Sequence, residues 1–342
     1  VIIPNTWLQS IKFRNIRSYL MNNYYWERVL HINDKVFKAV VDTHVLIFEK
    51  KSDVKNTALQ IDVLENKEIK GHQIINQNKL PDNGDIINIL AKEEDKKLFE
   101  KIKNLSNTIQ EISTVYNGVK PFEKGKGKPQ QTAEIMQTKP YVAENQSKPN
   151  KGKNWLPLLR GSLINRYTNF WNENSWIDYG IWLAAPRDPK VFEAEEKIIV
   201  RQTGDRIIAT LIGANIICRN NLHVIISNEL DHRYILGILN SKLTDFFYFQ
   251  INPERGEALA EVKKQHVEQL PIPKKAPEEQ QSEIVKHVEQ LLQLNKDLQS
   301  ATLENQKEQL QNRISYAEDK INQIVYELYE LTPEEIKIID AT

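Results

Sequence analysis

Five polar residues in the second half of the chain are of the types that read base edges in DNA. Arg187, Arg201, Gln202 and Asn221 lie in or beside short apolar runs, and Arg160 precedes a dense group of aromatic residues. Arginine can donate two hydrogen bonds to O6 and N7 of guanine, and Asn or Gln pairs in the same two-point way with adenine. We therefore predict that these five residues bind DNA, with bases and phosphates both open as their targets.

A second group consists of lysines that alternate with glycines. Lys124, Lys126 and Lys128 are separated by single glycines, and Lys120 precedes them. Glycine lets a backbone approach a surface closely, and lysine supplies contacts to phosphate. The run lacks the Gly-Lys-Ser/Thr ending of a nucleotide-binding loop. Contact with the DNA backbone and a flexible solvated loop are the two interpretations left open.

Charge is segregated along a chain whose formal net charge is zero. Residues 118–153 contain eight lysines and three glutamates, whereas residues 276–342 contain fourteen acidic and six basic residues. Clustered positive charge is what neutralises phosphates and releases counterions. The middle of the chain is therefore the region expected to face DNA, and the acidic end is not.

The sequence gives little support for a metal site, a disulfide bond or a membrane-spanning segment. The histidines lack metal-ligand spacing, and Cys218 is the single cysteine, which fits a reducing cytoplasm. A nuclease centre built from Asp188, Glu195 and Lys197 is a weak alternative. No apolar run approaches the roughly 20 residues that cross a bilayer. The start at Val1, inside an apolar run, leads us to expect a fragment of a longer protein.

The elements expected to position these residues are mostly short strands. Residues 197–203, 206–211, 215–218 and 222–226 are β-type runs separated by Gly, Pro and Asn, which predicts a curved sheet or half-barrel. Nearer the start, residues 26–32 and 39–48 are predicted strands. Residues 93–112 are a predicted helix.

Long helices are expected to close the chain. Residues 279–331 contain neither Pro nor Gly, and their apolar residues step by four and three positions. Thr332, Pro333 and Glu335 have the spacing of a further helix start. A helical hairpin folded on its own domain and a dimerisation surface are the two interpretations of this pattern.

Three further segments carry a resemblance to a known family. They are residues 197–204, which end a β-type run in Arg-Gln-Thr-Gly; residues 235–243, with a central Asn-Ser; and residues 270–273, Leu-Pro-Ile-Pro. In this order they resemble the TaqI-like C-terminal specificity domain of Type IIG restriction-modification enzymes. The Gly-Val-Lys-Pro and Gly-Lys-Gly-Lys runs resemble the entry to that domain. The resemblance implies recognition of double-stranded DNA.

The first fifty residues resemble the end of an N6-adenine DNA methyltransferase domain. In that family an aromatic residue at the position of Phe37 packs against the adenine flipped out of the duplex. Asn-Pro-Pro-Tyr and the glycine-bearing methyl-donor loop are not in this sequence. The chain is thus expected to hold no catalytic residues and to bind no cofactor. The resemblance implies S-adenosylmethionine for the full-length parent, and Mg where that parent also acts as an endonuclease.

Together these observations predict an α+β chain with four parts. Residues 1–50 are the remnant of a Rossmann-like methyltransferase sheet, 51–112 a charged connector with a helix, 113–275 a mixed α/β target-recognition domain with a curved sheet, and 276–342 C-terminal helices. The predicted function is DNA recognition for a parent enzyme that methylates adenine N6, and the sequence leaves open whether the parent also cleaves DNA. The alternative is a non-enzymatic interaction module that acts through its acidic coiled coil, with self-association through the same helices.

Overall fold

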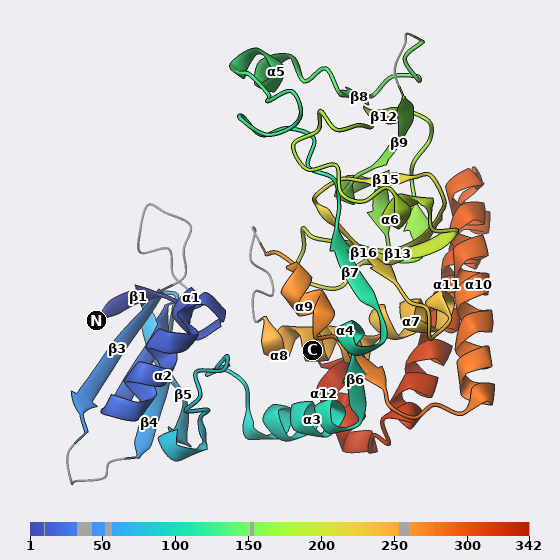
Figure 1. The fold of residues 1–342 in the computed structure, drawn as a ribbon. Helices are drawn as coiled ribbons and strands as arrows, with labels where there is room; N and C mark the ends of the chain where they lie inside the picture. Colours follow the sequence, from blue (N-terminus) through green and yellow to red (C-terminus); the bar gives the residue numbers. More distant parts are fainter. Residues whose placement is uncertain (10, 33–42, 52–56, 151–153, 253–259, 342) are drawn as a thin grey trace. The chain divides into compact units, whose positions relative to one another are not determined.

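The computed structural model describes residues 1–9, 11–32, 43–51, 57–150, 154–252 and 260–341 (Figure 1). They form two compact units, each considered by itself. The N-terminal unit comprises Val1–Lys96 with Gln250–Pro253, and the C-terminal unit comprises Lys97–Phe249 with Glu254–Thr342.

The N-terminal unit is built on a five-stranded sheet of order β1-β3-β2-β4-β5. Its strands are β1 (Ile2–Pro4), β2 (Tyr24–Ile32), β3 (Thr43–Lys50), β4 (Ala58–Glu65) and β5 (Glu68–Asn76). β2 runs antiparallel to β3 and parallel to β4. Two strands of this sheet thus come from residues 58–76, which the sequence assigned to the connector.

The core of this unit forms around two tryptophans. Trp7, in the short helix α1 (Thr6–Gln9), and Trp26, in β2, are fully buried with ring centroids 5.1 Å apart. Helix α2 (Arg14–Asn23) adds Arg17, which is buried and donates to Trp7 O at 2.7 Å and Gly84 O at 2.9 Å. A buried guanidinium is stable only when such acceptors surround it.

The C-terminal unit contains two four-stranded sheets. One has the order β14-β13-β16-β7, from β14 (Ala209–Gly213), β13 (Glu196–Arg201), β16 (Leu222–Ile226) and β7 (Thr114–Asn117). The other has the order β15-β9-β12-β8, from β15 (Ile217–Cys218), β9 (Trp155–Leu159), β12 (Ser175–Asp178) and β8 (Val142–Glu144). The α+β class is confirmed, with two separate sheets where one curved sheet was expected.

One hydrophobic core joins the two sheets. It combines Leu158 and Ile177 from the β9–β12 pair with Ile199 and Val224 from the β13–β16 pair. Phe192, in the short helix α6 (Lys190–Glu193), is 2% exposed in the same core. The ends of strands from both sheets are therefore held close to one another.

Smaller pairs and short helices complete the central part of the unit. They are β6 (Ser106–Thr108) with β17 (Pro271–Pro273), β10 (Ile164–Asn165) with β11 (Thr168–Asn169), and the helices α3 (Glu93–Asn104), α4 (Ile109–Ile112), α5 (Ala133–Thr138) and α9 (Lys264–Glu268). Residues 93–112 do not form the continuous helix that their periodicity predicted. Residues 106–108 pair with β17 instead.

Two long helices close the unit, as the sequence predicted. α10 (Glu278–Ser300) and α11 (Glu304–Leu328) lie side by side in Figure 1, and α7 (His232–Leu239) packs against both. At Gly237 of α7 a Cβ would lie 2.5 Å from Ile284 Cγ2, so this close approach requires glycine. The last helix, α12 (Pro333–Asp340), starts with Thr332 and Glu335 bonded to each other's backbone amides.

Candidate nucleic-acid interface

Three strands of one sheet end at the same edge and place charged residues there. β12 is antiparallel to both β8 and β9, and β15 is parallel to β9, so β8, β9 and β15 run in the same direction. Glu144 is the last residue of β8, while Arg160 and Arg219 directly follow β9 and β15. The three side chains therefore meet at one end of the sheet.

Glu144 binds both arginines at once. Its Oε2 accepts a hydrogen bond from Arg160 Nη1 at 3.0 Å, and its Oε1 accepts one from Arg219 Nη1 at 2.7 Å. The three side chains are between 27% and 31% exposed. Arg219 was not predicted as a site residue. Its local signal was its residue type directly after the short β-type run at residues 215–218.

Asn221 lies beside this edge, and part of its polar surface is used by the fold. Its Oδ1 accepts from the backbone N–H of Gly161 at 3.3 Å, and its backbone oxygen accepts from Gln202 N at 3.0 Å. Gln202 is half-buried, and its backbone oxygen accepts from Val262 N at 2.7 Å. These bonds hold Asn221 and Gln202 beside the end of the sheet where Arg160 lies. On the Asn221 side chain, Nδ2 is the polar atom left to bind a ligand.

Arg201, at the end of β13, joins the same cluster. A Cβ on Gly161 would lie 3.5 Å from Arg201 Cγ, so the two residues are direct neighbours. The Nε atoms of Arg160 and Arg201 are buried and have no hydrogen-bond partner in the described part of the chain. Buried donors without an acceptor are uncommon, because their desolvation is not repaid.

Two further candidates lie where residues 118–120 cross this edge. A Cβ on Gly118 would lie only 2.1 Å from Arg219 O, so glycine alone permits the crossing. The exposed Arg187 donates from Nε to Gly118 O at 3.1 Å. Lys120 Nζ lies 2.7 Å from Glu123 Oε2. Lys120 is thus paired with a carboxylate, whereas Arg187 forms no ion pair with a carboxylate among the described residues.

Residues 123–131, which we call the lysine loop, present the remaining predicted lysines. Lys124, Lys126 and Lys128 are all exposed. None forms an ion pair with a carboxylate in the part of the chain that the structure describes. Their charges are therefore available to an external anion.

The buried side chain of Gln131 holds the lysine loop in place through hydrogen bonds. This side chain is 2% exposed, donates to Pro121 O at 2.8 Å and Trp182 O at 2.9 Å, and accepts from Glu123 N at 2.8 Å. At Gly127 a Cβ would lie 2.3 Å from Trp182 O. Close packing and internal hydrogen bonds hold the loop in a defined shape, which the flexible-loop interpretation does not anticipate.

The arginines and amides of the cluster lie in a segment that matches a known domain family. Residues 156–272 match the family described as TaqI-like C-terminal specificity domain. The chain carries a TaqI-like C-terminal specificity domain. The matched range includes Arg160, Arg187, Arg201, Gln202 and Asn221, together with Arg219. Glu144 and the lysine loop precede it.

Solved structures give a likeness in fold over nearly the whole chain. The Type IIL restriction-modification enzyme MmeI, solved in complex with DNA, is similar over 98% of this chain and 47% of its own, with a TM-score of 0.57 at 12% identity. The Type IIG restriction endonuclease BpuSI covers the same shares at 12% identity, with a TM-score of 0.39. The chain thus spans about half the length of these proteins. No curated protein sequence matches it.

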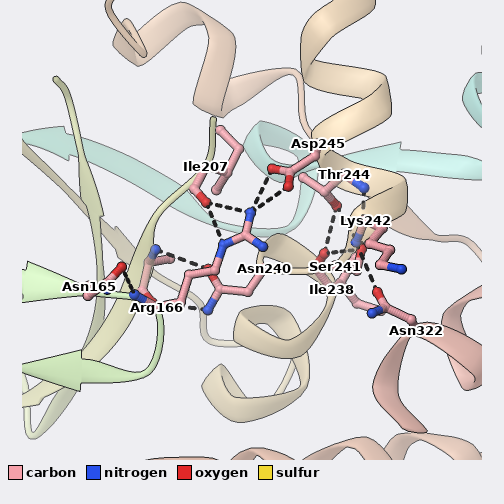
Figure 2. Close-up of polar contacts among 11 residues, drawn as sticks. Asn165, Arg166, Ile207, Ile238, Asn240, Ser241, Lys242, Thr244, Asp245 and Asn322 are labelled. Atoms are coloured by element: carbon pink, nitrogen blue, oxygen red, sulfur yellow. Dashed lines mark hydrogen bonds and ion pairs between the residues drawn. The ribbon is translucent and has the colours of Figure 1, made fainter. Parts of the chain in front are cut away.

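The Asn-Ser segment of the specificity domain has a structural explanation (Figure 2). Asn240 caps α7 and bonds to both backbone groups of Ala209 in β14, at 3.0 Å each. Ser241 and Thr244 donate to Ile238 O, which closes the turn into α8 (Lys242–Ile251). The motif therefore joins helices to the sheet, and its side chains serve the fold.

Lys197, which starts the first motif of the domain, is also structural. It is fully buried, and its Nζ donates to Gly213 O at 2.6 Å, Phe192 O at 3.0 Å and Ala194 O at 3.3 Å. Burial lowers the pKa of Lys197. A buried lysine tied to three carbonyls cannot serve a nuclease. The described residues contain no group of three or more His, Cys, Asp or Glu placed to hold a metal.

The predicted base platform, Phe37, lies outside the described residues. The strands on either side of that segment end at Ile32 and begin at Thr43. None of the helices in the described ranges is both long enough and apolar enough to cross a bilayer.

Proposed function

We propose that this chain recognises a specific sequence in double-stranded DNA on behalf of a restriction-modification enzyme. The observation that carries the proposal is the specificity-domain match over residues 156–272, whose strand ends gather Arg160, Arg201, Gln202, Arg219 and Asn221. Their guanidinium and amide groups are the ones that discriminate bases in a groove. MmeI, whose fold the chain resembles, is itself a restriction-modification enzyme.

The basic residues divide by their surroundings into two classes of contact. The exposed Lys124, Lys126 and Lys128 form no ion pair with a carboxylate among the described residues, which suits phosphates. The half-buried Arg201 and Gln202, held by strand ends, suit bases because discrimination needs fixed donors. Phosphate contacts then set the register in which the half-buried residues read the sequence.

The chemistry of the parent enzyme forms the second part of the proposal. The parent methylates adenine N6 with S-adenosylmethionine and cleaves DNA with Mg, through catalytic residues other than those of this chain. The N-terminal unit is the end of the methyltransferase sheet, and Phe37 stacks on the flipped adenine. In the parent, Phe37→Ala should lower methylation by about fivefold or more with an unchanged melting temperature, since stacking contributes roughly 1–3 kcal/mol per base. If Phe37→Ala lowered the melting temperature as well as methylation, the loss of activity would follow from unfolding and would contradict the platform role.

Selection from a randomised duplex library tests the central claim. The purified chain should enrich one short sequence, and its affinity should fall linearly with salt on logarithmic axes. Binding without enrichment would reduce the chain to a non-specific DNA binder. Absence of binding at low salt would contradict the proposal.

Self-association is the alternative role of the C-terminal helices, but much of their apolar surface is already buried within the C-terminal unit. The apolar faces of α10 and α11, including Ile284, Val288 and Ile321, pack against Gly237 of α7. Self-association would have to use outer positions such as Tyr316, which is 60% exposed. Light scattering across a range of concentrations, with Tyr316→Glu as the variant, tests this use of the helices.

A further inference from the structure

We propose that Glu144, Arg160 and Arg219 form a single base-reading group, in which Glu144 is the positioning residue that aims two guanidinium groups at one base pair or two adjacent ones. The inference rests on the proposed function and assigns a role to two residues that the sequence did not select. It begins from the carboxylate that holds both arginines, through Oε2 at 3.0 Å and Oε1 at 2.7 Å.

The fold holds the three side chains of this group in fixed positions. All three residues stand at the ends of strands that run in the same direction, and the backbone N–H of Arg219 donates to Leu159 O at 2.9 Å, beside Arg160. The side chains are less than a third exposed. Donors fixed on strand ends and supported by a partner keep their direction better than donors on free loops.

The group of Glu144, Arg160 and Arg219 differs from the lysine loop in its charge, because it includes a carboxylate bound to both of its cations. A carboxylate beside two guanidinium groups lowers their attraction for a phosphate, which itself carries negative charge. The lysine loop has no such carboxylate on Lys124 or Lys128 among the described residues. A site that only neutralised phosphates would gain from losing Glu144. Its presence is therefore better explained by base contacts, where direction matters more than net charge.

The arginines keep donors for a base while bound to Glu144. Each ion pair uses one nitrogen, and a guanidinium has five N–H donors. Arg160 Nε is buried, so the donors of Arg160 that remain for a base are the terminal N–H groups not used by Glu144. The O6 and N7 atoms of guanine are acceptors of matching geometry, and a carboxylate can also accept from cytosine N4. A G·C pair is the base pair that this group is suited to read.

The experiment compares the intact chain with four variants on two duplexes. One duplex carries the sequence enriched from a random library, and the other carries the same bases in scrambled order. Glu144→Gln removes the charge and keeps the shape. Glu134→Gln removes an exposed charge from α5 and serves as the matched control. Arg160→Lys and Arg219→Lys keep the charge and remove the planar fork. Circular dichroism confirms that each variant is folded.

For Glu144→Gln we expect tighter binding to the scrambled duplex and at least a tenfold lower ratio of enriched to scrambled affinity. In a repeated library selection, the loss of preference should be confined to one or two adjacent positions. Both lysine variants should lose preference at those positions with an unchanged salt slope. Glu134→Gln should leave the ratio and the enriched sequence unchanged.

Other outcomes would overturn the inference in distinguishable ways. If Glu144→Gln tightened both duplexes equally and left the enriched sequence intact, the group would contact phosphates. If preference weakened evenly across all positions, Glu144 would have only a general structural role. If the unaltered chain selected no sequence, the proposed function would fail and this inference with it, whereas the first two outcomes leave the proposed function standing.

Discussion

Arg166 and Asp245 form an ion pair in which Arg166 Nη2 lies 2.7 Å from both carboxylate oxygens (Figure 2). The same guanidinium donates twice to Ile207 O, at 3.0 Å and 2.9 Å. Arg166 therefore ties the turn between β10 and β11 to the approach to β14 and to helix α8. An arginine within the specificity domain is here part of the framework.

Removing Arg166 should accordingly affect stability and leave DNA recognition intact. We expect Arg166→Met to lower the free energy of unfolding by about 2 kcal/mol, because it leaves a partly buried Asp245 carboxylate without its partner. Urea unfolding measures the change. Arg313→Met, at an exposed position on α11, is the matched control and should be nearly neutral. A variant that kept full stability but lost sequence preference would place Arg166 in the interface.

The lysine loop gives a prediction that separates phosphate contacts from base contacts. Replacing Lys124, Lys126 and Lys128 by Ala should weaken binding to every duplex by a similar factor. The slope of log affinity against log salt should flatten by about one unit for each phosphate that is no longer neutralised. The same replacement of Lys286, Lys296 and Lys337, which are exposed on α10 and α12, should leave affinity nearly unchanged. A changed enriched sequence with an unchanged slope would show that the loop reads bases.

The order of the lysine loop can be tested without touching a lysine. Gln131→Ala removes three hydrogen bonds made by a buried side chain and should lower stability by about 1–3 kcal/mol. It should also weaken DNA binding, because the lysines would have to be ordered when DNA binds. Gln130→Ala alters an exposed neighbour and should do neither. Unchanged binding by a destabilised Gln131→Ala would show that loop order does not contribute to affinity.

The sequence predicted elements well where local pattern decides the structure, and poorly where distant pairing does. The run at residues 222–226 is β16, because a short apolar, β-branched run between turn signals suffices to mark a strand. The helix predicted over residues 93–112 ends at Asn104, because Ser106–Thr108 pair with Pro271–Pro273 far along the chain. Apolar periodicity carries no information on that pairing.

The candidate site shows the same limit. Arg160 was predicted and Arg219 was not, yet Glu144 bonds to both from 16 and 75 positions away. Asn221 was selected for its amide, whose oxygen the structure uses to hold Gly161. Residue type thus identified the kind of chemistry, and only the fold shows which atoms are left to perform it.

Buried histidines make stability depend on pH in a predictable direction. In the N-terminal unit the Trp7 indole N–H donates to His44 Nδ1 at 3.1 Å, so His44 is neutral and carries its proton on Nε2, 2.9 Å from His31 Nδ1. Burial, and then the neighbouring His31, lower the pKa of His44 to about 3. In the C-terminal unit burial, and then Lys263, lower the pKa of His266 to about 4.

A histidine whose pKa is lower in the folded state binds protons more tightly once unfolded. The free energy that neutral His44 and His266 contribute to folding is therefore complete above about pH 6.5. It is lost as the pH falls toward about 4 for His266 and about 3 for His44. At pH 5 each should reduce the free energy of unfolding by about 2 kcal/mol relative to pH 7.5. Urea unfolding at both pH values, followed by hydrogen exchange to resolve the two units, measures the effect. His266→Gln should reduce the pH dependence of the C-terminal unit alone, and His44→Gln that of the N-terminal unit alone; equal pH dependence in the variants and the unaltered chain would mean that neither histidine is held neutral by the fold.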